Sequence, residues 1–380
     1  MEKVKFLFTG DFCPINGVEK LFLNKEYEKV YGDFLPILKD KDFSISNLEC
    51  PLTLGQKKLL KAGPNLKANP KCIEGIKYGD FDIVTLANNH LMDYSEQGLN
   101  DTINLCKENG IEYVGAANNL NEASKIFYIE KNGIKFAILN FCENEFGIAK
   151  KEQPGVNPLN PITNYYQIKE AKNNADHVII IIHGGIGHYN LPSPERVSMY
   201  RLFADFGGTI IISHHSHAIS GYEIYNNVPI FYGLGNFLFD FPKYNSSTWF
   251  EGFIVESYFS KNKLENFSLI PYYQCKDSIS LAKMNDMQTK LFNEKVIKYS
   301  KIISNDKLLD EEWSVFLKNN YYQNYKKIIY LNSIFKILYR LKIFRIILFK
   351  FINKRLLLNL IRCEAHREII ISTLEKDLNN

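Results

Sequence analysis

Short apolar runs and amphipathic stretches alternate through the front half of the chain. Runs rich in β-branched residues and bounded by polar residues predict buried strands, and apolar residues at a spacing near 3.6 predict helices. Their alternation is typical of βαβ units and a largely parallel sheet. The apolar runs lie within residues 3–12, 42–50, 81–90, 176–185 and 209–217.

The helical stretches carry recognisable start and stop residues. Leu99, Ile103 and Cys106 stand at helical spacing. Ser95 is the expected N-cap of this helix and Gly110 its stop. Two further helices are expected over residues 28–40, with a break near Pro36, and over residues 192–208, with Pro194 near the first position.

Two asparagine-containing dipeptides predict β-hairpins. Asn132-Gly133 separates two apolar strands, and Asn-Gly is a strong signal for a two-residue hairpin turn. Asn226 and Asn227 stand between two alternating stretches in the same way. Two more strands are expected over residues 252–260 and 264–274. This number and order of elements predicts an α/β fold with two sheets packed face to face and helices outside.

The pattern becomes helical from about residue 285. Residues 287–303 form one amphipathic stretch, residues 309–331 a second, and residues 333–378 two or three more. We therefore expect a main domain over residues 1–280 and a basic, apolar helical appendage over residues 281–380. The pattern assigns no role to Cys363 or His366.

Three of the eight histidines lie within four consecutive positions, at the end of one apolar run. A buried strand that ends on a His-x-His pair directs two imidazole rings into one cleft. Neutral imidazole is a common ligand of transition metals. His214, His215 and His217 therefore indicate a metal site, although a histidine-rich surface loop would show the same residues.

The other four apolar runs also end on residues that can bind a metal ion. In open α/β sheets, ligands bind outside the carboxyl ends of the strands, so these side chains are expected to converge. Imidazoles, carboxylates and an asparagine oxygen suit two divalent ions bridged by one carboxylate. The residues at the ends of these runs are Asp11, Asn47, Glu49, Asn88, Asn89, His90 and His183.

The motifs around these residues resemble those of the calcineurin-like metallophosphoesterase superfamily. Within it, the chain is similar to the bacterial capsule-synthesis and poly-γ-glutamate-synthesis proteins of the CapA family over roughly residues 4 to 275. This resemblance implies a four-layer α-β-β-α sandwich with a C-terminal helical appendage. The matching blocks are GDFCP, NLECPLT, LANNHLMDY, IIHGGIGHYNLPSPE and ISHHSHAISGYEIYNNVPIFYGLGNFLFD.

The resemblance also implies roles for single residues. Asp11 would bind the first metal ion, and Glu49 would bridge both ions. His90 would lie near the leaving group as a catalytic acid, and Asp93 could orient it. The remaining ligands would be His217 for the first ion and Asn89, His183 and His215 for the second.

Three positions depart from the superfamily pattern. Its first block usually reads Asp-x-His, whereas this chain has Cys13, whose thiolate could replace the imidazole or whose thiol could be buried and inert. Asn47 competes with Glu49 for the place of the usual aspartate. Related proteins often have His-Glu after the two glycines of the fourth block, where this chain has Ile-Gly and then His188. These departures predict one tightly bound and one weakly bound ion.

Amino-acid composition and the spacing of the cysteines limit the cellular compartment in which we expect this protein. A hydrophobic fraction of 46% is ample for a large core, and the seven cysteines include no C-x-x-C pair. Scattered, unpaired cysteines favour a reducing compartment. The first residues do not resemble a signal peptide, and the chain has no long uncharged apolar run. We therefore expect a cytoplasmic protein, peripheral to the inner face of the membrane if its tail binds there.

Charge is distributed unevenly along the chain. Between residues 314 and 363 there are eleven Lys and Arg residues and no acidic residue, which leaves 35 basic and 42 acidic residues elsewhere. Basic amphipathic helices can lie on anionic membranes, and the alternative is a small helical bundle with a solvated basic face. No nucleic-acid recognition motif is present, so nucleic acid is not an expected partner.

The leading hypothesis is a metal-dependent hydrolase that acts on a phosphoester or related bond. One or two divalent ions, Mn²⁺, Fe or Zn²⁺, would lower the pKa of a bound water, and His90 would protonate the leaving group. The resemblance implies a role in the synthesis of a capsule or other anionic cell-surface polymer, poly-γ-glutamate or polysaccharide. The alternative is a non-catalytic or weakly catalytic metal-containing component of a membrane-associated synthesis assembly. The expected partners are an anionic polymer or phosphorylated substrate and a membrane surface or membrane synthase.

Overall fold

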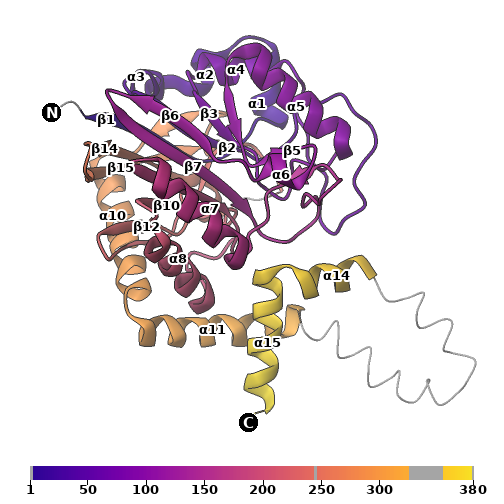
Figure 1. Cartoon of the computed structure of the whole chain (residues 1–380), viewed down its shortest axis with the longest axis vertical. Coiled ribbons are helices and arrows are strands. Elements are labelled where there is room, and N and C mark those ends of the chain that lie inside the picture. Colours follow the sequence, from indigo (N-terminus) through magenta and orange to yellow (C-terminus); the bar gives the residue numbers. More distant parts are fainter. Residues whose placement is uncertain (1–2, 244–245, 325–353, 379–380) are drawn as a thin grey trace, which may run out of the picture.

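Two β-sheets stacked face to face form the centre of the molecule (Figure 1). The computed structural model describes residues 3–243, 246–324 and 354–378. The first sheet contains the amino-terminal strand β1, which pairs in parallel with β2 and also with β13. Its order is β16 (Leu281–Lys283), β15 (Leu264–Gln274), β14 (Glu251–Phe259), β1 (Val4–Cys13), β2 (Phe43–Leu48), β3 (Ile83–Thr85) and β4 (Glu112–Val114), with β13 (Asn236–Phe239) beside β1.

The second sheet has six strands and a mostly parallel centre. β9 pairs in parallel with both β7 and β10, and an antiparallel hairpin lies at each edge. A separate two-stranded ribbon joins β5 (Ala116–Ala117) and β8 (Gly155–Val156). The order is β11 (Tyr222–Tyr225), β12 (Val228–Phe231), β10 (Ile210–His214), β9 (His177–His183), β7 (Ile134–Cys142) and β6 (Phe127–Lys131).

Side chains alternate between the two faces of each sheet. In β1, Phe6 and Phe8 enter the apolar cluster between the sheets, whereas Leu7 joins the cluster under the outer helices. In β9, Ile179 and Ile181 enter the inner cluster, while their neighbours face the opposite side. Each such side chain contributes about 1.5–3 kcal/mol when fully buried. A strand that is apolar on both faces needs cover on both faces, which explains the continuous apolar runs.

Helices cover the outer face of each sheet, so the expected four-layer α-β-β-α sandwich is confirmed (Figure 1). One layer packs on the first sheet and the other on the second. The first layer holds α1 (Asn16–Leu23), α2 (Tyr27–Tyr31), α3 (Leu35–Lys39), α4 (Cys72–Tyr78) and α5 (Ser95–Asn109), and the second holds α7 (Pro161–Asn174) and α8 (Pro194–Phe206). The short α6 (Leu120–Ala123) and α9 (Ser247–Phe250) lie in connections.

Most local predictions are confirmed, and two need correction. Both hairpins form, and Asn132 and Gly133 have the positive φ values that a tight turn requires. The helix predicted to break near Pro36 instead breaks at Gly32, which has φ 49°, and the proline stands in the first turn of α3. The N-cap of α5 is Tyr94 rather than Ser95, although the helix ends at Gly110 as predicted.

Four helices follow the last strand in the described residues. These are α10 (Asp286–Ile303), α11 (Asp306–Asn324), α14 (Lys354–Arg362) and α15 (Glu364–Leu378). α10 inserts Phe292 and Val296 into the cluster between the sheets. The division after residue 280 stays a prediction, and the expected helices within residues 325–353 lie outside the described residues. No helix in the described part of the chain is long and apolar enough to span a membrane.

Candidate metal centre

The carboxyl ends of parallel strands from both sheets meet at one edge of the sandwich. Asp11 at the end of β1 stands in register with Asn47 of β2, and His183 of β9 stands in register with His214 of β10. β1 approaches the loop before β13 so closely that a side chain at Gly10 would overlap the carbonyl oxygen of Gly235. This close approach brings ligands from the beginning of the chain beside ligands that lie some 200 residues later.

Asp11 and His217 form one side of the centre, which we call the aspartate side. The His217 Nδ1 lies 3.4 Å from Asp11 Oδ2 and 3.0 Å from the side-chain oxygen of Asn236. Asn236 therefore fixes the ring, and the other ring nitrogen, Nε2, lies 3.4 Å from Glu49 Oε1. The Asp11 carboxylate also accepts hydrogen bonds from Asn47 Nδ2 at 2.8 Å and from the backbone N–H of residue 215 at 3.1 Å.

Asn89, His183 and His215 form the opposite side, which we call the histidine side. The His183 Nε2 lies 3.1 Å from Asn89 Oδ1 and 3.1 Å from His215 Nδ1. The same nitrogen lies 3.6 Å from Glu49 Oε1. On this side, the last residue of β9 and one residue from each of two loops point at one small volume beside Glu49.

Glu49 lies between the two sides and is completely buried. Neither of its carboxylate oxygens has a hydrogen-bond partner among the described residues. Burial, together with the neighbouring charge of Asp11, raises the pKa of Glu49 well above its usual value. An isolated buried carboxylate is costly, and a cation bound on each side would remove that cost. The donor set of two carboxylates, an amide oxygen and imidazoles therefore fits one or two divalent ions.

The protonation of the other ligands also favours metal binding. Burial and the neighbouring His215 lower the pKa of His183, and burial lowers the pKa of His215 to about 4. Neutral imidazoles offer the lone pair that a metal requires. Burial alone would raise the pKa of Asp11, but His214 and His217 outweigh it and hold that pKa well below its usual range. Asp11 is therefore a charged ligand at neutral pH.

Two of the histidine ligands have a backbone conformation that is rare outside glycine. His215 has φ 89° and His217 has φ 52°. Such a conformation costs on the order of 1–3 kcal/mol and persists only where the surrounding structure requires it. Here it turns two imidazoles out of the same short loop toward opposite sides of Glu49.

His90 and Asp93 follow Asn89 of the histidine side in the chain, and their catalytic role stays a prediction. The His90 Nδ1 lies 2.6 Å from Asp93 Oδ2. Asn88 shapes this loop, because its side-chain oxygen accepts from the backbone N–H of His90 at 3.1 Å. Lys61 pairs with Asp93 and lies 3.2 Å from His90 Nδ1. Burial, followed by the charge of Lys61, lowers the pKa of His90.

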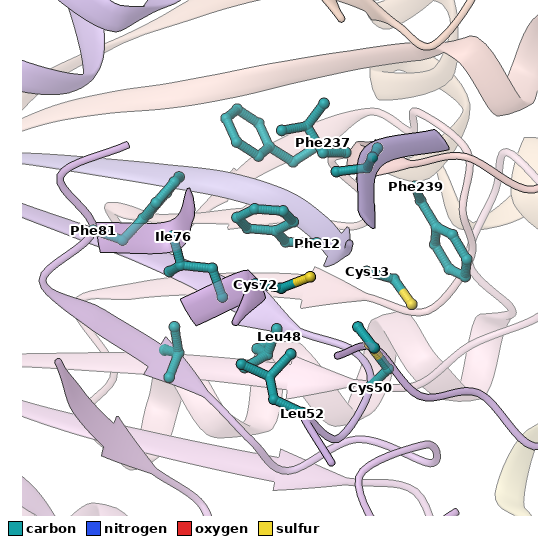
Figure 2. Packing of buried hydrophobic residues seen from close by; sticks show 14 of the residues in the cluster. Phe12, Cys13, Leu48, Cys50, Leu52, Cys72, Ile76, Phe81, Phe237 and Phe239 are labelled. Carbon is teal, nitrogen blue, oxygen red and sulfur yellow. The ribbon is translucent and has the colours of Figure 1, made fainter. Parts of the chain in front are cut away.

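Two of the residues that depart from the superfamily pattern, Cys13 and Asn47, lie in different surroundings. Cys13 is fully buried beside Cys50 and Phe239 in an apolar cluster (Figure 2). Burial raises the pKa of its thiol well above the usual value. The Nδ2 of Asn47 donates to Asp11 and also lies 3.2 Å from His183 Nδ1, and its competition with Glu49 stays a prediction.

His188 and His214 line the centre without joining the expected ligand set. The ring of His188 lies 6.0 Å from that of His217, and burial lowers the pKa of His188. His214 Nδ1 lies 3.3 Å from Asp11 Oδ1. His188 therefore stands at the wall of the aspartate side, whereas His214 contacts one of its ligands.

Three residues that contact this centre were missed by the sequence analysis. Lys61 comes from an irregular loop, and Asn236 is the first residue of β13. Glu145, which follows β7, accepts a hydrogen bond from Asn89 Nδ2 at 3.1 Å. β7 is also a buried parallel strand that ends at this edge, so the rule applied to the other strand ends could have identified Glu145.

The fold and this site define a four-layer α/β sandwich with a candidate metal centre at the carboxyl ends of its strands. The sequence profile of the bacterial capsule synthesis protein family PGA_cap matches residues 5–241, and the chain belongs to this family. All eight predicted site residues lie within that range, and α10 to α15 lie beyond it.

Two curated relatives carry related names. The capsule biosynthesis protein CapA of Bacillus anthracis is 36% identical over 248 residues, which cover 63% of this chain and 60% of that protein. The PGA biosynthesis protein CapA of Bacillus subtilis strain 168 is 35% identical over 238 residues, which cover 61% and 62%. The match thus spans about three fifths of the length of these relatives.

Solved structures with a similar arrangement are more distant. A hypothetical protein from Thermus thermophilus has a TM-score of 0.46 and 11% identity, over 71% of this chain and 99% of that one. A 5'-nucleotidase precursor from the same organism has a TM-score of 0.40 and 12% identity, over 80% and 59%.

Proposed function

We propose that this chain is a metal-dependent hydrolase of the metallophosphatase type that acts on a phosphoester or related bond during the synthesis of an anionic capsule polymer. The observation that carries the proposal is the fully buried Glu49 carboxylate, which has no partner within the described residues. It lies 3.4 Å and 3.6 Å from the Nε2 atoms of His217 and His183. A buried carboxylate without a partner is costly, so this arrangement supports a cation bound at this place.

The residues that would hold the ions are those on both sides of Glu49. Asp11 and His217 would hold one ion, and Asn89, His183 and His215 the other. Mixed nitrogen and oxygen donors suit Mn²⁺, Fe or Zn²⁺. When bound, such ions supply an activated water at neutral pH and neutralise charge on the group under attack.

His90 would act as a general acid and donate a proton to the leaving group. Asp93 accepts from Nδ1 and so orients the ring, which leaves Nε2 as the nitrogen that exchanges a proton with the substrate. Lys61 pairs with Asp93 and offsets its charge. Burial and then the charge of Lys61 lower the pKa of His90, which makes the protonated ring a stronger acid toward the leaving group.

A phosphodiester assay tests this proposal. Purified full-length chain, stripped of metal with a chelator and reloaded with Mn²⁺, is expected to hydrolyse bis(p-nitrophenyl) phosphate. His90→Gln is expected to lower turnover by about 100-fold, within the range for loss of a general acid. His177→Gln is the matched control, because His177 lies at the opposite end of β9 and binds the backbone oxygen of Ser260.

The alternative is a metal-containing component without catalytic activity, and the buried position of Cys13 favours it. If the imidazole of the usual pattern is replaced by a thiol that faces an apolar cluster, the aspartate side has one ligand fewer. Metal binding without turnover above background, or turnover that neither His90→Gln nor His217→Ala alters, would support this alternative and end the hydrolase proposal.

We also propose that α14 contacts an anionic membrane surface at the inner face of the membrane. Leu357, Leu358 and Ile361 are 42%, 49% and 59% exposed, and Lys354 and Arg355 precede them. An exposed apolar stripe beside basic residues suits anionic lipid. Vesicles of phosphatidylglycerol should pellet the wild-type chain, and Leu357→Gln with Ile361→Gln should reduce the bound fraction several-fold. Equal pelleting of both proteins would contradict membrane contact by α14.

A further inference from the structure

The last two helices return to the candidate centre from far along the chain. α14 and α15, drawn in yellow in Figure 1, lie beyond α11 in sequence and pack near its end. Glu364 accepts hydrogen bonds from the backbone N–H and the side chain of Asn144, at 2.9 Å and 2.5 Å. Glu368 accepts from Ser193 at 2.5 Å. The first contact places the junction of α14 and α15 against the loop that follows β7, and the second places α15 against the start of α8.

This junction brings together three residues with metal-binding side chains. One donor atom of each of Glu145, Cys363 and His366 lies within 4.8 Å of the other two. The Cys363 sulfur lies 3.9 Å from Glu145 Oε1. In a tetrahedral zinc site with bonds of about 2.0–2.3 Å, a sulfur and an oxygen ligand lie roughly 3.5 Å apart. Small side-chain movements would therefore bring three of the four ligands of such a site into place, and a water would take the fourth position.

A buried polar atom without a hydrogen-bond partner lies next to His366 and also favours a metal site here. Asn359 is 5% exposed, and its Nδ2 faces His366 Nδ1 at 3.1 Å. Its Oδ1 is buried and has no hydrogen-bond partner. The two ends of an amide are assigned rather than observed, and rotating this amide lets Oδ1 accept from an Nδ1–H. That arrangement fixes the tautomer whose Nε2 lone pair can bind a metal, as second-layer carbonyls do in metal sites.

The local charges are also suitable. Glu143 is neutralised by Arg196, and Arg362 lies over the ring of Phe146 at 4.2 Å. Both carboxylates approach the Cys363 sulfur, Glu143 Oε2 at 3.7 Å and Glu145 Oε1 at 3.9 Å, but Glu143 is already paired with Arg196, which leaves Glu145 for a cation. A carboxylate and a thiolate together balance the charge of one divalent ion, and the thiolate favours a softer ion such as Zn²⁺ over Mn²⁺.

We propose that Glu145, Cys363 and His366 bind a zinc ion at a site separate from the centre around Glu49. The ion joins the C-terminal helices to the loop after β7. Glu145 also accepts a hydrogen bond from Asn89, so the site fixes a residue that supports the histidine side of the first centre. Cys363 and His366 lie beyond the residues matched by the family profile, so the site depends on this chain's own C-terminal segment.

Substitution with Co²⁺ tests the proposal without any measurement of turnover. A cobalt ion bound to a cysteine thiolate shows a charge-transfer band in the near ultraviolet, which nitrogen and oxygen ligands do not give. The cobalt-loaded full chain is expected to show this band. Cys363→Ser should abolish it, and the matched control Cys275→Ser, a buried cysteine after β15, should retain it. Elemental analysis of the zinc-loaded Cys363→Ser chain should show about one ion per chain fewer.

Three further variants make the test decisive. Asn359→Ala keeps all three ligands and should weaken zinc affinity by about 10–100-fold, as loss of a ligand's hydrogen-bond partner does. His366→Gln should shift or abolish the band even if Cys363→Ser fails to fold. Glu49→Gln should retain the band, which separates this site from the first centre. A cobalt-loaded wild type without the band, or a band that survives Cys363→Ser, overturns the proposal.

Discussion

The two sides of Glu49 differ in how much of their chemistry is satisfied without a metal. On the aspartate side, Asp11 accepts from Asn47 and from the backbone, and the nearby His217 ring is fixed by Asn236. On the histidine side, the Nε2 of His183 lies 3.1 Å from each of two other potential ligands. A ring nitrogen carries at most one hydrogen, so these contacts cannot all be satisfied at once, and an unused lone pair remains on the histidine side beside the unpartnered oxygens of Glu49.

This difference suggests that the two ions are held with unequal strength. The histidine side offers three side chains besides Glu49, and the aspartate side offers two. The missing ligand is at Cys13, whose thiol faces the apolar cluster rather than the centre. We therefore expect a tightly held ion on the histidine side and a readily exchanged ion on the aspartate side.

The largest effect is expected for Glu49→Gln, which removes the ligand common to both sides. Both ions should be lost on dialysis, and turnover should fall to background. The metal-free variant should nevertheless be more stable than the metal-free wild type, by about 1–3 kcal/mol, because an unpartnered buried charge is gone. Elemental analysis and thermal unfolding of chelator-treated proteins measure the two effects.

The stability difference between metal-free Glu49→Gln and the metal-free wild type should depend on pH. The pKa of Glu49 is raised above 4.5 in the folded chain, so its ionisation lowers metal-free stability as pH rises above about 4.5. The advantage of Glu49→Gln should therefore shrink in acid. Glu223→Gln is the control, because Glu223 is buried but paired with Arg201, and its loss should destabilise the protein. A Glu49→Gln variant less stable than the metal-free wild type would contradict the proposed role.

The second largest effect is expected for His215→Asn, which removes one imidazole from the histidine side. Asparagine tolerates the positive φ of residue 215 better than most residues, so the loop should keep its shape. The tightly bound ion should be lost, and turnover should fall by about 100-fold or more, above the effect typical for loss of a ligand's hydrogen-bond partner. Retention of one ion per chain after dialysis would show that the tight site lies elsewhere.

A smaller effect is expected on the aspartate side. His217→Asn should leave the tightly bound ion in place, while the Mn²⁺ concentration needed for half-maximal turnover rises. Asn236→Ala leaves every ligand intact but frees the His217 ring, and should raise the same concentration by about 10–100-fold. Metal titrations of turnover measure both variants. If His217→Asn instead removes the tight ion, the two sides have been ranked in the wrong order.

Part of the candidate metal centre could be predicted from the sequence, because buried parallel strands have a recognisable apolar pattern. Parallel strands that are buried on both faces read as continuous apolar runs, and their ends meet at one edge, so Asp11, Glu49 and His183 could be grouped from the sequence. The roles assigned to single residues came from the family resemblance and stay predictions. Lys61 could not be identified because its irregular loop has no repeating pattern.

The docking of the C-terminal helices was not predictable for a different reason. Glu364 binds Asn144 across 220 residues, and such a contact leaves no local pattern in either segment. The same holds for α10, whose amphipathic pattern was visible although its insertion between the sheets was not. Local patterns predict which face of an element is buried, but not which distant surface covers it.

The smallest effect on metal binding is expected for Cys13→Ser, which tests why the two sides differ. The Cys13 thiol is fully buried among apolar side chains (Figure 2), so a hydroxyl there should cost about 1–3 kcal/mol of stability. Metal content and the metal dependence of turnover should stay as in the wild type, because the thiol binds neither ion. A rise in the Mn²⁺ requirement as large as that of Asn236→Ala would mean that the Cys13 thiolate turns to the aspartate side as a ligand. The inequality between the two sides would then need another cause.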